Sequence, residues 1–360
     1  KLNSIGVIGP NANSRASLIG NYHGTSSRYV TVLEGIQKVC DKNDIRVHYS
    51  DGSHLFKERV ENLAFDDDRI SEAVIVAKNS DVVVLVVGLD ETLEGEEGDT
   101  GNSYASGDKE TLNLPASQMR MIETLEAVGK PIILINMTGS AMDLAFAKNN
   151  DTYGAILQAW YPGCMGGKAI ADILFGKISP SGKLPVTFYN SLDELPDFED
   201  YSMKGRTYKY MENPAQYPFG FGLTYANVEM TGASLENEEN AKSLIKSDNV
   251  YDGSISVRAN IKNTSGIKTD EVVQVYIKNH NSEYAVRNHS LCGFKRVGLD
   301  AFEEKEVTIN IPSRAFMVVN EEGKYIQDGD KFTLYVGVSQ PDEVSVSLCK
   351  VNPLKIEINL

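Results

Sequence analysis

Acidic side chains are concentrated in one stretch of this 360-residue chain, Gly88–Pro115. Closely spaced carboxyl groups suit general acid–base chemistry, because mutual repulsion favours keeping a proton on one of them. A loop that is merely solvated is the alternative interpretation of such a cluster taken alone. The cluster comprises Asp90, Glu91, Glu94, Glu96, Glu97 and Asp99.

The element that positions this cluster is the apolar run Asp81–Val87, which leads directly into it. Consecutive β-branched residues are typical of a strand that is buried on both faces of a parallel sheet. In open α/β sheets, ligands bind beyond the carboxyl ends of the strands. The acidic stretch is also too long for a simple connection between a strand and a helix. We therefore predict that the functional site lies in this loop.

Composition limits the classes of partner. The chain has 50 acidic and 35 basic residues, for a net charge of −15. This excess argues against nucleic acid and anionic membrane surfaces as partners. No apolar stretch approaches the ~20 residues of a membrane span, and we expect no secretory signal among these residues. Four cysteines without CxxC spacing predict neither a metal site nor a disulfide framework, and favour a reducing, cytoplasmic location. No cofactor is predicted.

The first part of the chain alternates strand and helix patterns, which predicts an α/β domain over residues 1–195 with a mostly parallel sheet sandwiched by helices. Besides the central run, strands are predicted at Ile5–Gly9, Arg46–Tyr49, Pro131–Asn136, Ala155–Ala159 and Leu184–Phe188. Helices are predicted at Val30–Cys40, Ile70–Lys78, Ser117–Val128, Ser140–Lys148 and Gly166–Phe175.

The pattern changes after residue 195. Residues 196–222 are rich in aromatic and acidic side chains and predict a linker that lies on a surface. Residues 223–360 show alternation of period two, which predicts an all-β sandwich of about seven strands. The clearest runs are Ser254–Ile261, Glu271–Ile277, Lys305–Ile311, Lys331–Val336 and Val344–Leu348.

Several separate motifs resemble the carboxyl-terminal part of family 3 glycoside hydrolases, the β-glucosidases and β-xylosidases, in the order expected for that family. The resemblance extends over essentially the whole chain and implies that its last part is a fibronectin-III-like domain. The motifs are Ile5–Ala12, Glu94–Gly98, Gly107–Pro115, Trp160–Gly163, Ser179–Pro185, Tyr217–Gly222 and Gly293–Val297.

The resemblance implies a retaining mechanism, in which two carboxyl groups ~5–5.5 Å apart serve as nucleophile and as general acid/base. Matching the Gly-Glu pair of the family motif assigns the acid/base to Glu96, with Glu97 and Glu94 as alternatives. The nucleophile is implied to be an aspartate on a (β/α)8 barrel, which needs ~200 residues or more. We therefore expect this chain to be a fragment, a nicked half or a subunit that is completed by a barrel domain or a complementary chain.

The predicted substrate is a β-linked glycoside. Asp108 and Lys109 are implied to bind it by the family motif, although many members carry arginine where this chain has Lys109, and lysine lacks the bidentate fork of a guanidinium. The loop residues Tyr22, His23 and Thr25 are predicted to face the same cleft. Trp160 either offers a platform for a sugar or packs at a helix–sheet junction.

A second hypothesis is a non-catalytic carbohydrate-binding or scaffolding module. Retention of Glu96 together with Asp108 and Lys109 favours the glycosidase, because a degenerate binding module has no chemical need for all three. The sequence leaves open whether the sugar is glucose or xylose.

Overall fold

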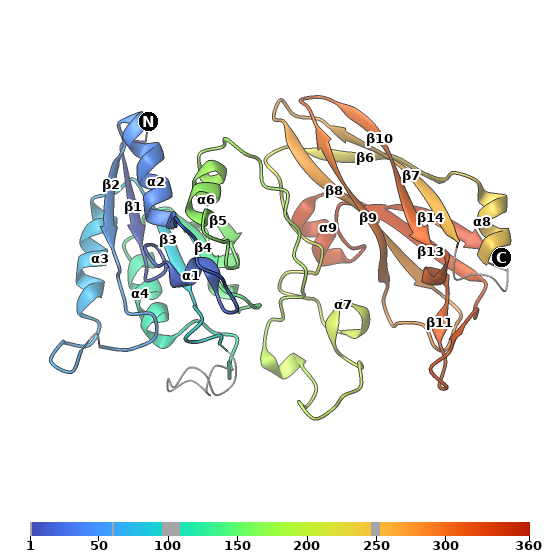
Figure 1. Cartoon of the computed structure of the whole chain (residues 1–360), viewed down its shortest axis with the longest axis horizontal. Helices are drawn as coiled ribbons and strands as arrows, with labels where there is room; N and C mark the ends of the chain where they lie inside the picture. The colour runs from blue at the N-terminus through green and yellow to red at the C-terminus, as the bar shows by residue number, and fades with distance from the viewer. Residues whose placement is uncertain (1, 60, 96–108, 246–252) are drawn as a thin grey trace. The chain divides into compact units, whose positions relative to one another are not determined.

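The computed structural model describes residues 2–59, 61–95, 109–245 and 253–360 (Figure 1). Packing divides the chain into two compact units, Lys1–Lys177 and Ile178–Leu360. Residues 178–195, which were predicted to belong to the first domain, pack within the second unit.

The first unit is built on a five-stranded parallel sheet with the strand order β2-β1-β3-β4-β5. Its central strand β3 is the apolar run that was predicted from the sequence, and every residue from Val83 to Gly88 is buried. The strands are β1 (Ser4–Ile8), β2 (Arg46–Ser50), β3 (Val82–Gly88), β4 (Ile132–Met137) and β5 (Tyr153–Gln158).

Helices cover both faces of this sheet (Figure 1). On one face, α2 and α6 pack on Val84 and Val86 of β3 through apolar residues such as Ile36 and Ile170. The helices α3 and α4 lie on the other face. Complete burial of an aliphatic side chain contributes ~1.5–3 kcal/mol, so this double cover stabilises the central strand strongly. The helices are α1 (Ala16–Ile19), α2 (Val32–Cys40), α3 (Asp68–Lys78), α4 (Ala116–Glu126), α5 (Ala145–Lys148) and α6 (Gly166–Leu174).

The second unit contains two antiparallel sheets, ordered β10-β7-β6 and β14-β13-β8-β9, and a small ladder of β11 and β12. Alternate residues of the two larger sheets form one apolar core, as in β7, where Ile255, Val257, Ala259 and Ile261 are buried. The strands are β6 (Val228–Leu235), β7 (Ser254–Asn263), β8 (Thr269–Asn279), β9 (Ser290–Leu299), β10 (Glu304–Pro312), β11 (Val318–Val319), β12 (Tyr325–Ile326), β13 (Lys331–Gly337) and β14 (Leu354–Asn359). The helices are α7 (Thr207–Tyr210), α8 (Glu238–Ile245) and α9 (Glu343–Cys349).

The predicted fold class is confirmed, an α/β domain followed by an antiparallel β-sandwich. Two predicted strands were wrong. Val344–Leu348 lies in helix α9, because the side chain of Asp342 caps its start by accepting a hydrogen bond from Ser345 N at 3.0 Å. Leu184–Phe188 is not a strand of the sheet, since Phe188 forms only an isolated bridge with Tyr217. Helix α5 is also shorter than the predicted Ser140–Lys148.

A buried ion pair fastens the start of the second unit to its β-sandwich. Lys183 Nζ lies 2.7 Å from Glu271 Oε1 of β8, and their side chains are 9% and 3% exposed. Burial raises the pKa of the Glu271 carboxyl, although the ammonium of Lys183 acts in the opposite direction.

Among the helices that the structure describes, none has the length and apolar character of a membrane span.

Candidate active site

The carboxyl edge of the parallel sheet contains a topological switch point between β1 and β3. These strands are neighbours in the sheet, but the chain visits the outer strand β2 between them. The connections that follow β1 and β3 therefore diverge and leave a crevice between them, which is where ligands bind in doubly wound folds. This edge is where the acidic loop leaves the sheet, directly after Gly88.

The end of β3 is fixed by hydrogen bonds before the acidic residues begin. The buried side chain of Gln118, from α4, donates to Gly88 O at 2.7 Å and accepts from Gly88 N at 2.9 Å. Asp90 then closes a short turn, because its carbonyl accepts from Glu94 N at 2.9 Å and its side chain accepts from Thr92 N at 2.9 Å. This turn directs Glu94 toward the ends of the neighbouring strands.

Glu94 is the point where loops from three strands meet. One carboxylate oxygen, Oε2, accepts from Gly139 N at 2.6 Å and from Tyr161 Oη at 2.5 Å. The other, Oε1, accepts from the hydroxyl of Ser140 and lies 3.7 Å from Lys109 Nζ. Gly139 and Ser140 follow β4, and Tyr161 follows β5. The Glu94 side chain is only 10% exposed, so this network is largely shielded from water.

Lys109 turns its ammonium into the protein. Lys109 Nζ donates to Ala141 O at 3.0 Å and lies 3.2 Å from Met142 Sδ, in addition to its ion pair with Glu94. Burial lowers the pKa of Lys109, while the negative charge of Glu94 opposes this shift. Lys109 therefore braces two loops in this structure, and its contact with a sugar stays a prediction.

Trp160 and Tyr161 follow β5 with an unusual backbone. Trp160 has φ +54°, in the left-handed region that is rare for bulky side chains. Burial raises the pKa of the adjacent Tyr161 hydroxyl, and the nearby Glu94 carboxylate raises it further. Tyr161 is therefore a hydrogen-bond donor over the whole physiological pH range. Trp160 lies at the predicted edge of the sheet and is partly buried, and its role as a platform for a sugar stays a prediction.

The loop that follows β1 reaches the same edge. His23 Nε2 lies 3.0 Å from Glu91 Oε2, which joins the predicted binding loop to the acidic loop. Tyr22 and Thr25 are exposed, and Tyr22 is 83% exposed in a left-handed conformation. The structure thus brings the two predicted parts of the site together, while the sugar contacts of these residues stay predictions.

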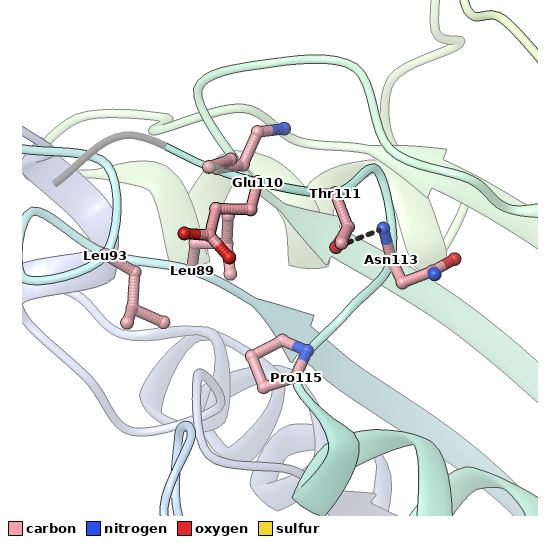
Figure 2. Close-up of a pocket in the computed structure, with 7 residues that line it drawn as sticks. Leu89, Leu93, Glu110, Thr111, Asn113 and Pro115 are labelled. Carbon is pink, nitrogen blue, oxygen red and sulfur yellow. Dashed lines mark hydrogen bonds between the residues drawn. The ribbon is translucent and has the colours of Figure 1, made fainter. Parts of the chain in front are cut away.

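A pocket of about 330 Å³ opens beside the end of β3 (Figure 2). Figure 2 shows Leu93 on one side and Thr111 and Asn113 on the other, with a hydrogen bond from Asn113 N to Thr111 Oγ1. Leu89, Glu110 and Pro115 also line the pocket. Its volume falls at the lower end of the range for small-molecule sites, and Lys109 also contributes to its lining.

Glu96, Glu97 and Asp108, three of the predicted site residues, lie outside the described residues. Sequence reasoning did not identify Tyr161 or the pair Gly139–Ser140 as partners of Glu94. A usable signal was present, because both segments directly follow predicted strands of the same parallel sheet. Within the described ranges, no three histidine, cysteine or acidic side chains are grouped as they would be around a metal ion.

Comparison with known proteins gives matches along the chain. The glycosyl hydrolase family 3 C-terminal domain matches residues 1–225, and the fibronectin type III-like domain matches residues 271–340. A periplasmic β-glucosidase of Salmonella typhimurium is 30% identical over an alignment of 365 positions, which covers 94% of this chain and 45% of that protein. A xylan 1,4-β-xylosidase of Xylanibacter ruminicola is 38% identical over 242 residues, or 67% of this chain and 26% of that protein.

A crystal structure of a β-glucosidase from Bifidobacterium adolescentis is similar to this chain, with a TM-score of 0.78 and 29% identity. The similarity covers 99% of this chain and 49% of that one. This chain spans less than half the length of these relatives.

Proposed function

Because this chain belongs to glycoside hydrolase family 3, we propose that it supplies the general acid/base of a retaining β-glycosidase that hydrolyses terminal non-reducing β-D-glycosides. Glu96 is the proposed acid/base. The nucleophile, an aspartate, belongs to a (β/α)8 barrel domain or complementary chain that completes the active site. Relatives that are named as β-glucosidases and as β-xylosidases both support this class of substrate.

The observation that carries this proposal is the convergence of strand-end loops around the start of the acidic loop. A glycosidase needs its acid/base carboxyl held on a fixed support, because proton transfer requires hydrogen-bond reach to the leaving oxygen. Glu94 is bound by residues that follow β4 and β5, so the acidic loop starts from a fixed point of the sheet.

The same contacts favour Glu96 or Glu97 over Glu94 as the acid/base. Both oxygens of Glu94 already accept hydrogen bonds from the protein, and its side chain is only 10% exposed. To act as a general acid, Glu94 would have to exchange some of these contacts for one with the leaving oxygen. Of the two remaining residues, Glu96 matches the glutamate of the family motif.

The test is hydrolysis of 4-nitrophenyl β-glucoside and β-xyloside by the purified chain, by a purified family 3 barrel domain, and by the two together. We expect turnover only from the mixture. Robust turnover by this chain alone would contradict the proposal, because every catalytic group would then lie within it. A mixture that forms a stable complex and binds sugar without turnover would instead identify a carbohydrate-binding module.

A further inference from the structure

Residues 139–142, which follow β4, hold both ends of one segment of the acidic loop. Glu94, where this segment begins, accepts hydrogen bonds from Gly139 N and from the Ser140 hydroxyl. Lys109, where it ends, donates to Ala141 O at 3.0 Å and contacts Met142 Sδ at 3.2 Å. Positions 94 and 109 of the acidic loop are therefore both attached to residues 139–142.

Tyr161 adds a third attachment point, and its ring lies between two glycines. A Cβ atom at Gly20 would lie 2.3 Å from Tyr161 Cδ2, and one at Gly139 would lie 2.8 Å from Tyr161 Cε2. Real Cβ contacts are not this short, so a larger residue at either position would displace the ring. The two glycines thus provide the space in which Tyr161 reaches Glu94.

The backbone of Trp160 gives Tyr161 its direction. A left-handed conformation is unfavourable for a bulky residue and persists only where the surrounding structure imposes it. Such residues are concentrated at functional sites. The left-handed residue Trp160 directly precedes Tyr161, whose hydroxyl donates to Glu94. We therefore treat the strained backbone and this hydrogen bond as parts of the same local structure.

This arrangement requires a carboxylate at position 94. Hydrogen bonds reach both oxygens, from Gly139 and Tyr161 on one and from Ser140 on the other. The amide of a glutamine has a single acceptor oxygen and would turn its NH₂ group toward one set of donors. Glutamine would also leave Lys109, whose side chain is 19% exposed, without its ion-pair partner.

We propose that Glu94, Lys109 and Tyr161 form a clasp with residues 139–142, and that holding this clasp is the role of Glu94. The clasp fixes positions 94 and 109 to the ends of β4 and β5. Glu94 and Tyr161 are accordingly positioning residues for the acid/base that lies between those positions. This last step rests on the proposed function, whereas the clasp itself does not.

The first experiment tests the clasp in this chain without any measurement of activity. Trp160 is the only tryptophan of the chain and adjoins Tyr161, so its fluorescence reports on the clasp. We expect Glu94→Gln and the milder Tyr161→Phe to shift the Trp160 emission and to increase its quenching by acrylamide. Circular dichroism would check that both variants are folded.

The chain offers matched controls at the other end of the same strand. Tyr153, the first residue of β5, donates to Glu126 Oε1 at 2.6 Å, so it forms the same kind of pair away from the clasp. We expect Tyr153→Phe and Glu126→Gln to leave the Trp160 emission unchanged. Folded Glu94→Gln and Tyr161→Phe variants with the emission and quenching of these controls would overturn the clasp.

The second experiment tests positioning in the enzyme completed by a barrel domain. Misplacement of a catalytic group by about 1 Å can cost ~100-fold in rate. We expect Glu94→Gln and Tyr161→Phe to lower kcat by up to ~100-fold with little change in KM, and Glu126→Gln to leave both unchanged. Rescue of Glu94→Ala by azide would overturn positioning, because it would identify Glu94 as the acid/base itself. If the completed wild-type enzyme lacks turnover while the emission changes hold, the proposed function fails and the clasp stands.

Discussion

His23 Nε2 lies 3.0 Å from Glu91 Oε2, and this contact joins the loop after β1 to the loop after β3 across the switch point of the sheet. Both side chains remain about one-third exposed, at 33% and 38%. The predicted binding loop and the acidic loop thus share one edge of the sheet. A ligand at this edge can reach both loops, as the proposed function requires.

The identity of the acid/base can be tested by chemical rescue in the enzyme completed by a barrel. Glu96→Ala should slow substrates with poor leaving groups far more than activated aryl glycosides, since acid assistance is worth ~10²–10⁴-fold and activated groups need little of it. Azide should restore turnover and yield a β-glycosyl azide, because a small anion needs no base to attack the glycosyl-enzyme. Rescue of Glu97→Ala, with Glu96→Ala near wild type, would move the assignment by one residue.

The glycine beside Tyr161 gives a stability prediction with an internal control. Gly20 has φ +60° and Tyr161 beside it, whereas Gly129 has φ +73° and open space around it. Both alanine substitutions strain the backbone, and Gly20→Ala does so more, because ψ −147° places Gly20 in a region that is essentially restricted to glycine. Gly20→Ala also meets the ring, and because overpacking typically costs ~1–3 kcal/mol, it should lower the free energy of unfolding of the first unit by at least about that much more than Gly129→Ala. Urea unfolding followed by Trp160 emission measures the difference, and equal losses would argue against the predicted steric contact.

The buried ion pair between Lys183 and Glu271 predicts a large loss of stability when one partner is removed. Lys183→Met would leave Glu271 buried without its cation, which typically costs ~3–5 kcal/mol. The double variant Lys183→Met/Glu271→Gln should recover part of this loss, because it removes the buried charge. Arg258→Met breaks an exposed pair with Glu236 and should cost less than ~1 kcal/mol. Urea unfolding followed by circular dichroism compares the three, and a Lys183→Met loss as small as that of Arg258→Met would disprove the prediction.

His289 should make the second unit less stable in acid. Burial lowers the pKa of His289 in the folded protein, although its bond to Gln340 Oε1 at 2.7 Å acts in the opposite direction. The unfolded chain, with a histidine pKa of ~6.5, then binds the proton first. The second unit is therefore most stable above pH ~6.5. Its free energy of unfolding decreases as the pH falls from there to the lower pKa of His289 in the folded protein.

Calorimetry between pH 7 and pH 5 checks this, with Trp160 emission identifying the transition of the first unit. His289→Gln should make the melting temperature of the second unit less dependent on pH. His54→Gln is the control, because His54 also has a pKa lowered by burial but belongs to the first unit. An unchanged slope in His289→Gln would show that other groups control the acid response.

Local sequence patterns predicted much of the fold, because the strands of a parallel sheet are continuous apolar runs. They failed where tertiary contacts decide between alternatives. The alternation in Val344–Leu348 is too short to distinguish a strand from a helix, and the cap from Asp342 favours the helix. The acidic loop was located correctly at the end of β3. Its partner Tyr161 was missed, although its position after a predicted strand of the same sheet was a usable signal. The contact itself also depends on the backbone of Trp160 and on the space left by Gly20, which lie outside that signal.

The packing of residues 178–195 determines where a gene could be divided to produce the two parts separately. Leu184 and Phe188 exchange backbone hydrogen bonds with residues 216–221, and Lys183 holds Gly222 O at 2.6 Å. A break after codon 195 would carry these residues away with the α/β part and expose the surfaces that they cover. The codon of Lys177 is therefore the better place to divide the gene, because each expressed product then retains its own packing partners.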